Sequence, residues 1–138
     1  NESAVTFANR IEGLGTVELA GTAPITFGSA TGLDEDLKLD LCGTAQTLGA
    51  MPPFAEIVNS SSQKAKFALA ENLGTVAWGE RTLSPADKIE LEIGEGTMLD
   101  LGGQTLTVRS MSEGSRKRIV NGEIVETNPK RGIILIVR

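Results

Sequence analysis

Short segments in which apolar and polar residues alternate strictly, separated by glycine, constrain this chain most. In Leu37–Leu41 the three leucines alternate with Lys38 and Asp40, and Ile89, Leu91 and Ile93 alternate with two glutamates in the same way. A period of two is typical of a β-strand with one buried face. Glycine supplies 16 of the 138 residues, which is well above an average of roughly 7% and favours tight turns between the segments. We therefore predict an all-β protein.

The predicted strands are short and are divided by turns. The run from Ile133 to Val137 is apolar on both faces, which is typical of a central strand. Met51–Phe54 contains two prolines and is predicted to be a loop. Residues 62–73 fit either a short helix capped by Ser62 or a strand, and both alternatives stay open. The six predicted strands are Ala4–Ala8, Thr16–Ala20, Leu37–Cys42, Lys88–Ile93, Gln104–Ser110 and Gly132–Val137.

Arg116–Thr127 carries a strong hairpin signal. Asn121 and Gly122 separate two strand-like runs, and Asn-Gly suits the two positive φ angles of a type I′ turn. A two-residue loop places Lys117 opposite Glu126, a pair of opposite charge. We expect this hairpin to project from the body as a C-terminal arm.

An internal echo suggests a duplication of about 60 residues. The matches keep their order and are separated by 58 to 62 positions. We predict a single domain over residues 1–138, with pseudo-repeats 1–60 and 61–120 packed as one small, mainly antiparallel β-barrel or sandwich with at most one short helix. The clearest matches are Leu14–Val17 with Leu73–Val76, Leu39-Asp40-Leu41 with Leu99-Asp100-Leu101, and Gln46-Thr47-Leu48 with Gln104-Thr105-Leu106.

Composition removes several kinds of active site. The chain has no histidine and one cysteine, Cys42, so it cannot build a Ser-His-Asp or Cys-His site, a thiolate zinc cluster or an internal disulfide framework. Only five residues are aromatic, too few for the stacking platforms that bind single-stranded nucleic acid. We predict a protein that is not an enzyme, with no catalytic residue, cofactor or metal, and no apolar run long enough to span a membrane.

The remaining candidate residues fit structural roles. Asp34, Asp36 and Asp40 form the densest acidic cluster, but the glycine and glutamate of a calcium loop are absent from their places. Glu90 and Glu92 are expected on a strand surface. Trp78 is expected in the core. Asn59-Ser60-Ser61 has the glycosylation pattern and is expected to be idle.

Charge is distributed unevenly along the chain. Residues 1–100 carry 15 acidic and 6 basic residues, whereas residues 101–138 carry 3 and 7. An acidic body argues against sequence-specific or general DNA binding, while opposite patches allow copies to join head to tail. The candidate partner-contact residues are Arg116, Lys117, Arg118, Glu123, Glu126, Lys130 and Arg131.

Residues 81–138 resemble a known group of proteins. The run Leu101-Gly-Gly-Gln-Thr-Leu-Thr-Val108, the basic segment after it and the last strand resemble the small β-barrel virion proteins of tailed bacteriophages, nearest the head–tail joining type. The resemblance implies a non-enzymatic homo-oligomeric ring at the neck or tail of a virion. Such a ring contacts other virion proteins through heterologous surfaces and the arm, and its acidic lumen lets DNA pass.

Other functions stay open. The chain could instead be a capsid-decoration, tail or adhesin-like β-module, which shares the same composition. An enzyme based on Asp34, Asp36 or Asp40, and a carbohydrate or peptide binder built around Trp78, are weaker alternatives. The resemblance implies location in the virion after synthesis in the host cytoplasm.

Overall fold

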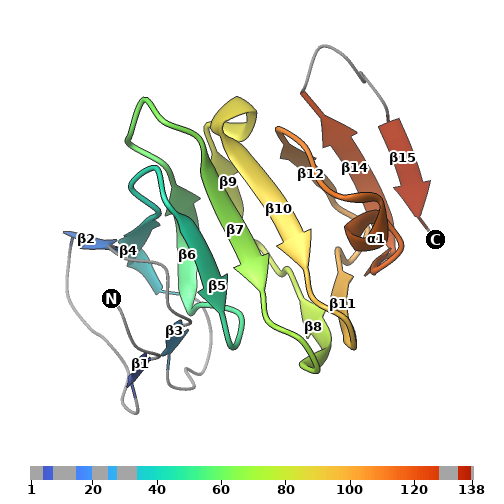
Figure 1. The fold of residues 1–138 in the computed structure, drawn as a ribbon, viewed down its shortest axis with the longest axis horizontal. Helices are drawn as coiled ribbons and strands as arrows, with labels where there is room; N and C mark the ends of the chain where they lie inside the picture. Colours follow the sequence, from blue (N-terminus) through green and yellow to red (C-terminus); the bar gives the residue numbers. More distant parts are fainter. Residues whose placement is uncertain (1–4, 8–14, 20–24, 28–33, 128–133, 138) are drawn as a thin grey trace.

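The chain folds as a β-solenoid of about four turns, with 53% of its residues in strands. The computed structural model describes residues 5–7, 15–19, 25–27, 34–127 and 134–137. Strands of successive turns lie side by side along the long axis of the molecule, with β1 and β2 near one end and β14 and β15 at the other (Figure 1).

The strands are short, and most corners between them are tight. In the described ranges, the four-residue α-helix α1 (Glu113–Arg116) and the 3₁₀ turn η1 (Ala86–Lys88) interrupt them. No helix among the described residues is long and apolar enough to cross a membrane. In chain order the strands are β1 (Val5–Phe7), β2 (Gly15–Glu18), β3 (Ile25–Phe27), β4 (Asp34–Asp40), β5 (Ala45–Leu48), β6 (Phe54–Val58), β7 (Ala65–Leu69), β8 (Gly74–Ala77), β9 (Thr82–Ser84), β10 (Ile89–Ile93), β11 (Thr97–Asp100), β12 (Thr105–Val108), β13 (Ile119–Val120), β14 (Gly122–Glu126) and β15 (Ile134–Val137).

Four sheets form the faces of the solenoid. Sheet A has the order β1-β3-β5-β7-β10, sheet B β2-β4-β6-β9, sheet C β13-β11-β8 and sheet D β12-β14-β15. Paired residues are 20 positions apart at Val5 and Ile25, and 24 apart at Ala65 and Ile89, so one turn takes a little over twenty residues. The echo at about 60 residues therefore spans roughly three turns.

The predicted antiparallel barrel or sandwich is wrong. Each strand pairs with the strand one turn later, and these pairs are parallel; among the described strands only β14 and β15 pair antiparallel. Alternation of apolar and polar residues shows that a strand has one buried face. One exposed face is more common in antiparallel sheets, but here the alternating strands pair in parallel. The predicted strands with one buried face are confirmed, but the strands with which they pair differ from the prediction.

The predicted Arg116–Thr127 hairpin arm is also wrong. β13 pairs with β11 and β14 pairs with β12, so the two runs beside Asn121 belong to different sheets. Asn121 does have a positive φ of 58°, but it serves a corner between two faces. Gly122 lies so close beneath the 99–104 turn that an added Cβ would collide with the Leu101 side chain and the Gln104 carbonyl.

Other local predictions have clear outcomes. All six predicted strands overlap strands of the structure, and residues 65–69 settle the open segment as strand β7. Residues 51–53 of the proline segment lie outside the strands, as predicted, but Phe54 is the first residue of β6. Among the described strands, the last one, β15, pairs with β14 alone and lies at the edge of sheet D, so the prediction of a central strand is wrong.

The core consists of apolar ladders that run through successive turns. In sheet A, Ile25 pairs with Leu48, Leu48 with Leu69, and Leu69 with Ile93. All four side chains are buried. Because each strand places an apolar residue at the same register, every turn covers the core of the turn beside it.

Candidate functional site

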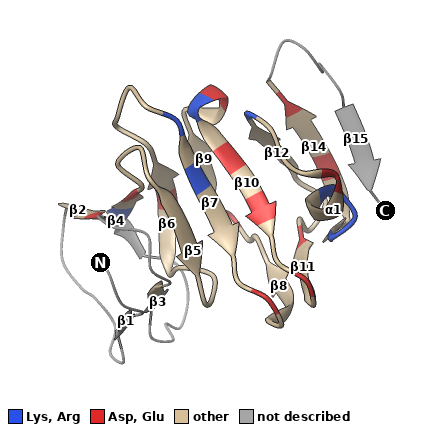
Figure 2. Cartoon of the chain, in the orientation of Figure 1, with Lys and Arg blue, Asp and Glu red and all other residues tan. Residues whose placement is uncertain are grey.

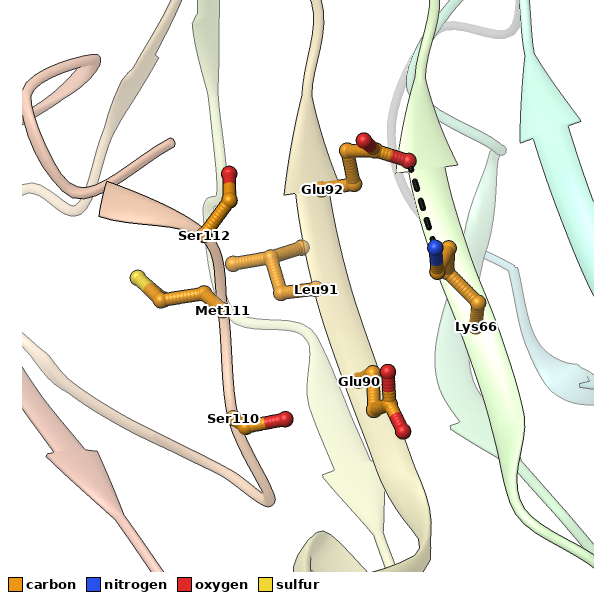
Figure 3. A pocket seen from close by; sticks show the side chains of 7 residues that line it. All are labelled: Lys66, Glu90, Leu91, Glu92, Ser110, Met111 and Ser112. Carbon is orange, nitrogen blue, oxygen red and sulfur yellow. Dashed lines mark ion pairs between the residues drawn. The ribbon is translucent and has the colours of Figure 1, made fainter. Parts of the chain in front are cut away.

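The outer face of sheet A contains a shallow hollow of about 310 Å³. Figure 3 shows its lining side chains, and Figure 2 shows the charged residues along β7 and β10 from which several of them come. Ile89, Leu91 and Ile93 point into the core, so the alternate residues of β10 face outward. The hollow is lined by Lys66, Glu90, Leu91, Glu92, Ser110, Met111 and Ser112.

Lysines neutralise the two carboxylates of the hollow. Lys66 Nζ lies 3.5 Å from Glu92 Oε2, and Lys64 Nζ lies 3.3 Å from Glu90 Oε1. These side chains are between 29% and 58% exposed, so each pair contributes on the order of 0.2–1 kcal/mol. Glu92 is paired with Lys66 on β7, and Glu90 is paired with Lys64 just before β7. Neither glutamate is paired with the other, as a general acid and base pair would require.

The hollow offers hydroxyls and mixed charge, without an aromatic side chain. Over the described part of the chain, no group of three or more His, Cys, Asp or Glu residues is placed to hold a metal ion. Asp40 of the acidic cluster accepts hydrogen bonds from the amides of Cys42 and Ser60 at a corner of the fold. The chemistry available here is weak polar contact with a partner.

The corner at Asp40 holds the only cysteine. Burial alone would raise the pKa of Asp40, but hydrogen bonds from the Ser60 hydroxyl and from the amides of Cys42 and Ser60 outweigh burial and lower it. Burial and the Asp40 carboxylate raise the pKa of the Cys42 thiol. The thiol therefore stays protonated near neutral pH, which makes it a poor nucleophile.

Asn59 fastens three successive turns to one another. Its Oδ1 accepts hydrogen bonds from the amides of Gly43 at 2.8 Å and Ser61 at 3.2 Å, and its Nδ2 donates to the carbonyls of Gln63 at 2.8 Å and Lys88 at 3.1 Å. Asn59 is 3% exposed. The glycosylation pattern at this residue is therefore closed to modification in the folded chain.

Trp78 lies in the core. It is 2% exposed and meets Phe67 edge to face, with 6.1 Å between the ring centroids. Its indole Nε1 donates to the Arg81 carbonyl at 3.0 Å. Burial lowers the pKa of Arg81, whose guanidinium donates to the Pro52 carbonyl. The bonds from Arg81 to Pro52 join neighbouring turns, and the burial of Trp78 leaves no ring face for a ligand.

The predicted partner-contact residues have diverse surroundings. The Arg116 guanidinium donates hydrogen bonds of 2.7 Å to both carboxylate oxygens of Glu126. The Glu126 side chain is 1% exposed. Arg118 donates to the Ile93 carbonyl at 2.8 Å. Lys117 is exposed and Glu123 half-buried, while Lys130 and Arg131 lie outside the described residues. The predicted opposition of Lys117 and Glu126 is replaced by the Arg116–Glu126 pair.

Sequence reasoning missed the buried polar residues that organise the corners and the C-terminal end. Asn59, Thr97 and Ser115 are each 3% exposed or less. Thr97 Oγ1 donates to Ala70 and accepts from the Leu73 amide. A short polar residue beside a turn gives no sequence signal that separates burial from exposure.

No protein-family model, curated protein or solved structure matches this chain.

Proposed function

We propose that this chain is a non-catalytic structural module of the tail or adhesin-like kind, which supplies a stiff length of stacked strands to a larger surface assembly. The observation that carries the proposal is the apolar ladder Ile25, Leu48, Leu69 and Ile93, which continues through four strands of sheet A. Such a ladder joins each turn to its neighbours.

The outer surface supports the same role. The Lys64–Glu90, Lys66–Glu92 and Lys38–Glu56 pairs join adjacent turns and place both signs of charge on the outer surface. Mixed charges on a strand face keep it from associating indiscriminately. The side chains of Asn59 and Arg81 each bind other turns of the same chain.

The virion ring at a head–tail neck stays a prediction. The geometry gives it no support beyond the uneven charge, because the barrel and the Arg116–Thr127 arm on which it depended are absent from the structure. The tail or adhesin-like alternative needs neither of these features.

Immunogold labelling of the native producer tests the proposal. An antibody raised against the purified chain is applied to intact cells and to the particles that they release, with the antibody pre-adsorbed on the pure chain as the control. We expect gold on the outer surface of cells or along the tails of virions. Label confined to the cell interior would overturn the proposal, and label at the neck would favour the ring.

A further inference from the structure

Four columns of outward side chains run across the outer face of sheet A. β5, β7 and β10 pair in one register, so the outward residues of neighbouring strands line up side by side. Residues 110–112 add the fourth column, because the Leu91 amide donates to the Ser110 carbonyl at 3.0 Å. This column ends where the chain turns into α1, and there the Ile93 amide donates to Ser115 Oγ instead. Across the face, the columns are Ala45 with Thr47, Lys66 with Ala68, Glu90 with Glu92, and Ser110 with Ser112.

The columns differ in charge. The first and the last contain only short, uncharged side chains. The β7 column is positive, and Lys64, just before β7, adds a second ammonium group to it. The β10 column is negative. Figure 2 shows blue on β7 beside red on β10. A row of two lysines thus lies directly beside a row of two glutamates.

Such a face is complementary to a copy of itself. A two-fold axis that runs along the strands, between β7 and β10, places β7 of one copy on β10 of the other. Lys66 then meets Glu90 of the second copy, because the two residues share one register position. In the outer columns, Thr47 meets Ser112 of the second copy for the same reason. Among the side chains of these four columns, unlike charges face each other and like charges do not.

We propose that two copies of this chain associate face to face through the outer side of sheet A, with the lysine column of each on the glutamate column of the other. An interface around a two-fold axis needs one patch that carries both halves of every contact, and this face meets that requirement. Charge also fixes the position of the axis: on β7 it would set lysine against lysine, and on β10 glutamate against glutamate. This inference does not depend on the proposed function.

The ion pairs within one copy do not exhaust these groups. Lys66 Nζ lies 3.5 Å from Glu92 Oε2, and Lys64 Nζ lies 3.3 Å from Glu90 Oε1. An ammonium group has three donors and a carboxylate about four acceptor sites, so each group can keep its partner and bind a second one across the interface. The pairs within a chain also restrain the four side chains before the copies meet, which reduces the entropy lost on association.

The size of the face predicts a weak dimer. Four columns about 4.8 Å apart, on strands of about five residues at roughly 3.3 Å each, cover on the order of 300 Å² per copy. The two copies together bury about 600 Å², below the roughly 1,200 Å² at which stable interfaces begin. We therefore expect association that depends on protein concentration and weakens with salt, which screens the partly exposed charges.

Charge reversal in the two columns tests the dimer. Lys64→Glu with Lys66→Glu makes both columns negative, and Glu90→Lys with Glu92→Lys makes both positive. Either variant sets like charges against each other when identical copies meet. Sedimentation equilibrium at a series of protein concentrations gives the mass. At the highest concentration, we expect the wild type to have a weight-average mass at least about 1.5-fold that of either variant, because the variants stay monomeric.

Mixing the two variants separates a docking face from damage to the fold. In an equal mixture the negative face of one variant fits the positive face of the other, so the mass should rise at least to the wild-type value. Lys38→Glu with Lys117→Glu is the matched control. It reverses two exposed lysines that belong to neither column, and it should keep the wild-type mass.

A wild type that stays monomeric at the highest concentration would overturn the inference. Variants that keep the wild-type mass, or a mixture that does not associate, would overturn it as well. If either variant loses its strand signal in circular dichroism, the wild type decides the matter. Its mass should fall towards that of the monomer when sodium chloride is raised from about 0.05 M to about 1 M, where the screening length is about 3 Å. A mass that does not change with salt refutes the inference.

Discussion

Two corners of the solenoid share a sequence and a turn but differ in their surroundings. The 39–44 corner and the 99–104 corner both contain Leu-Asp-Leu followed by two residues with positive φ. In each, the aspartate accepts a hydrogen bond from the amide two residues later, at 2.9 and 2.8 Å. In each, a backbone bond of 3.0 Å closes the turn, from Thr44 to Leu41 and from Gln104 to Leu101.

The difference lies in the turn stacked on each corner. Over the 39–44 corner, Asn59 binds the Gly43 amide, and an added Cβ on Gly43 would lie 2.5 Å from the Ser61 hydroxyl oxygen. Around Gly103 nothing lies within 4 Å of such an atom. The conformation of a corner is thus encoded locally, whereas its tolerance of substitution is set by residues about twenty positions away.

The largest expected effect follows from Asn59→Ala. Truncation leaves the amides of Gly43 and Ser61 and the carbonyls of Gln63 and Lys88 without their side-chain partner. Each buried polar group that loses its partner costs on the order of 1 kcal/mol or more, so we expect a loss of about 4 kcal/mol in the free energy of unfolding, measured with urea.

Asn121→Ala is the control for this prediction, since Asn121 is stacked on the other corner through its backbone carbonyl alone. Its loss should be about 1 kcal/mol, from the positive φ. Equal losses at both asparagines would contradict the idea that the Asn59 side chain fastens the turns.

Gly43→Ala is expected to have the next largest effect. The φ of Gly43 is 68°, and an added methyl group would also press on the Ser61 Cβ at 2.8 Å. We expect a loss of about 3 kcal/mol, combining backbone strain with overpacking. Gly103→Ala, where φ is 86° and space is open, should cost only about 1 kcal/mol. Thermal unfolding of both variants gives the comparison, and a reversed order would refute it.

The two corners also show what the sequence could predict about the fold. Leu39–Gly43 and Leu99–Gly103 were matched from the sequence alone, and they do form the same turn. Their separation was interpreted as one repeat, although it covers about three turns. Successive turns have different sequences and share mainly the positions of their buried apolar residues. The period of one turn, a little over twenty residues, therefore leaves little trace in residue identities.

The direction of pairing was hidden for a physical reason. Asn121-Gly122 predicts a hairpin because a type I′ turn needs positive φ at both residues, but here only Asn121 has a positive φ, which a corner between two parallel sheets also uses. Among the candidate partner-contact residues, charge identifies Arg116 and Glu126. It does not predict that these two side chains bind each other. Ser115 was not named at all, because its role depends on where the β10 edge ends.

A smaller effect is expected for Asp40→Asn, and it depends on pH. Since the folded pKa of Asp40 is lowered, its charge stabilises the fold above the ordinary value of about 3.9. That stabilisation is lost as the pH falls through the folded value. We expect Asp40→Asn to cost about 1.5 kcal/mol at pH 7, and we expect the gap to the wild type to narrow in strongly acidic solution.

Urea unfolding of both proteins across this pH range measures the gap. Asp100→Asn is the matched substitution in the other corner, where the carboxylate accepts an exposed bond from Gly102. It should cost less at pH 7. A gap at Asp40 that does not change with pH would show that the hydrogen bonds act independently of its charge.

The smallest expected effect comes from making one corner resemble the other. Cys42 has a φ of 51°, a conformation that costs a residue with a Cβ about 1 kcal/mol, while the equivalent Gly102 has a φ of 59°. Cys42→Gly removes this strain, but glycine gains freedom in the unfolded chain and the partly buried thiol loses its contacts. We expect a net gain of no more than about 0.5 kcal/mol, with Gly102→Cys losing about 1 kcal/mol. Paired urea titrations resolve a difference of this size between the two swaps. A clear loss in Cys42→Gly would mean that the thiol packing outweighs the backbone strain, and that the two corners differ even in the turn that they share.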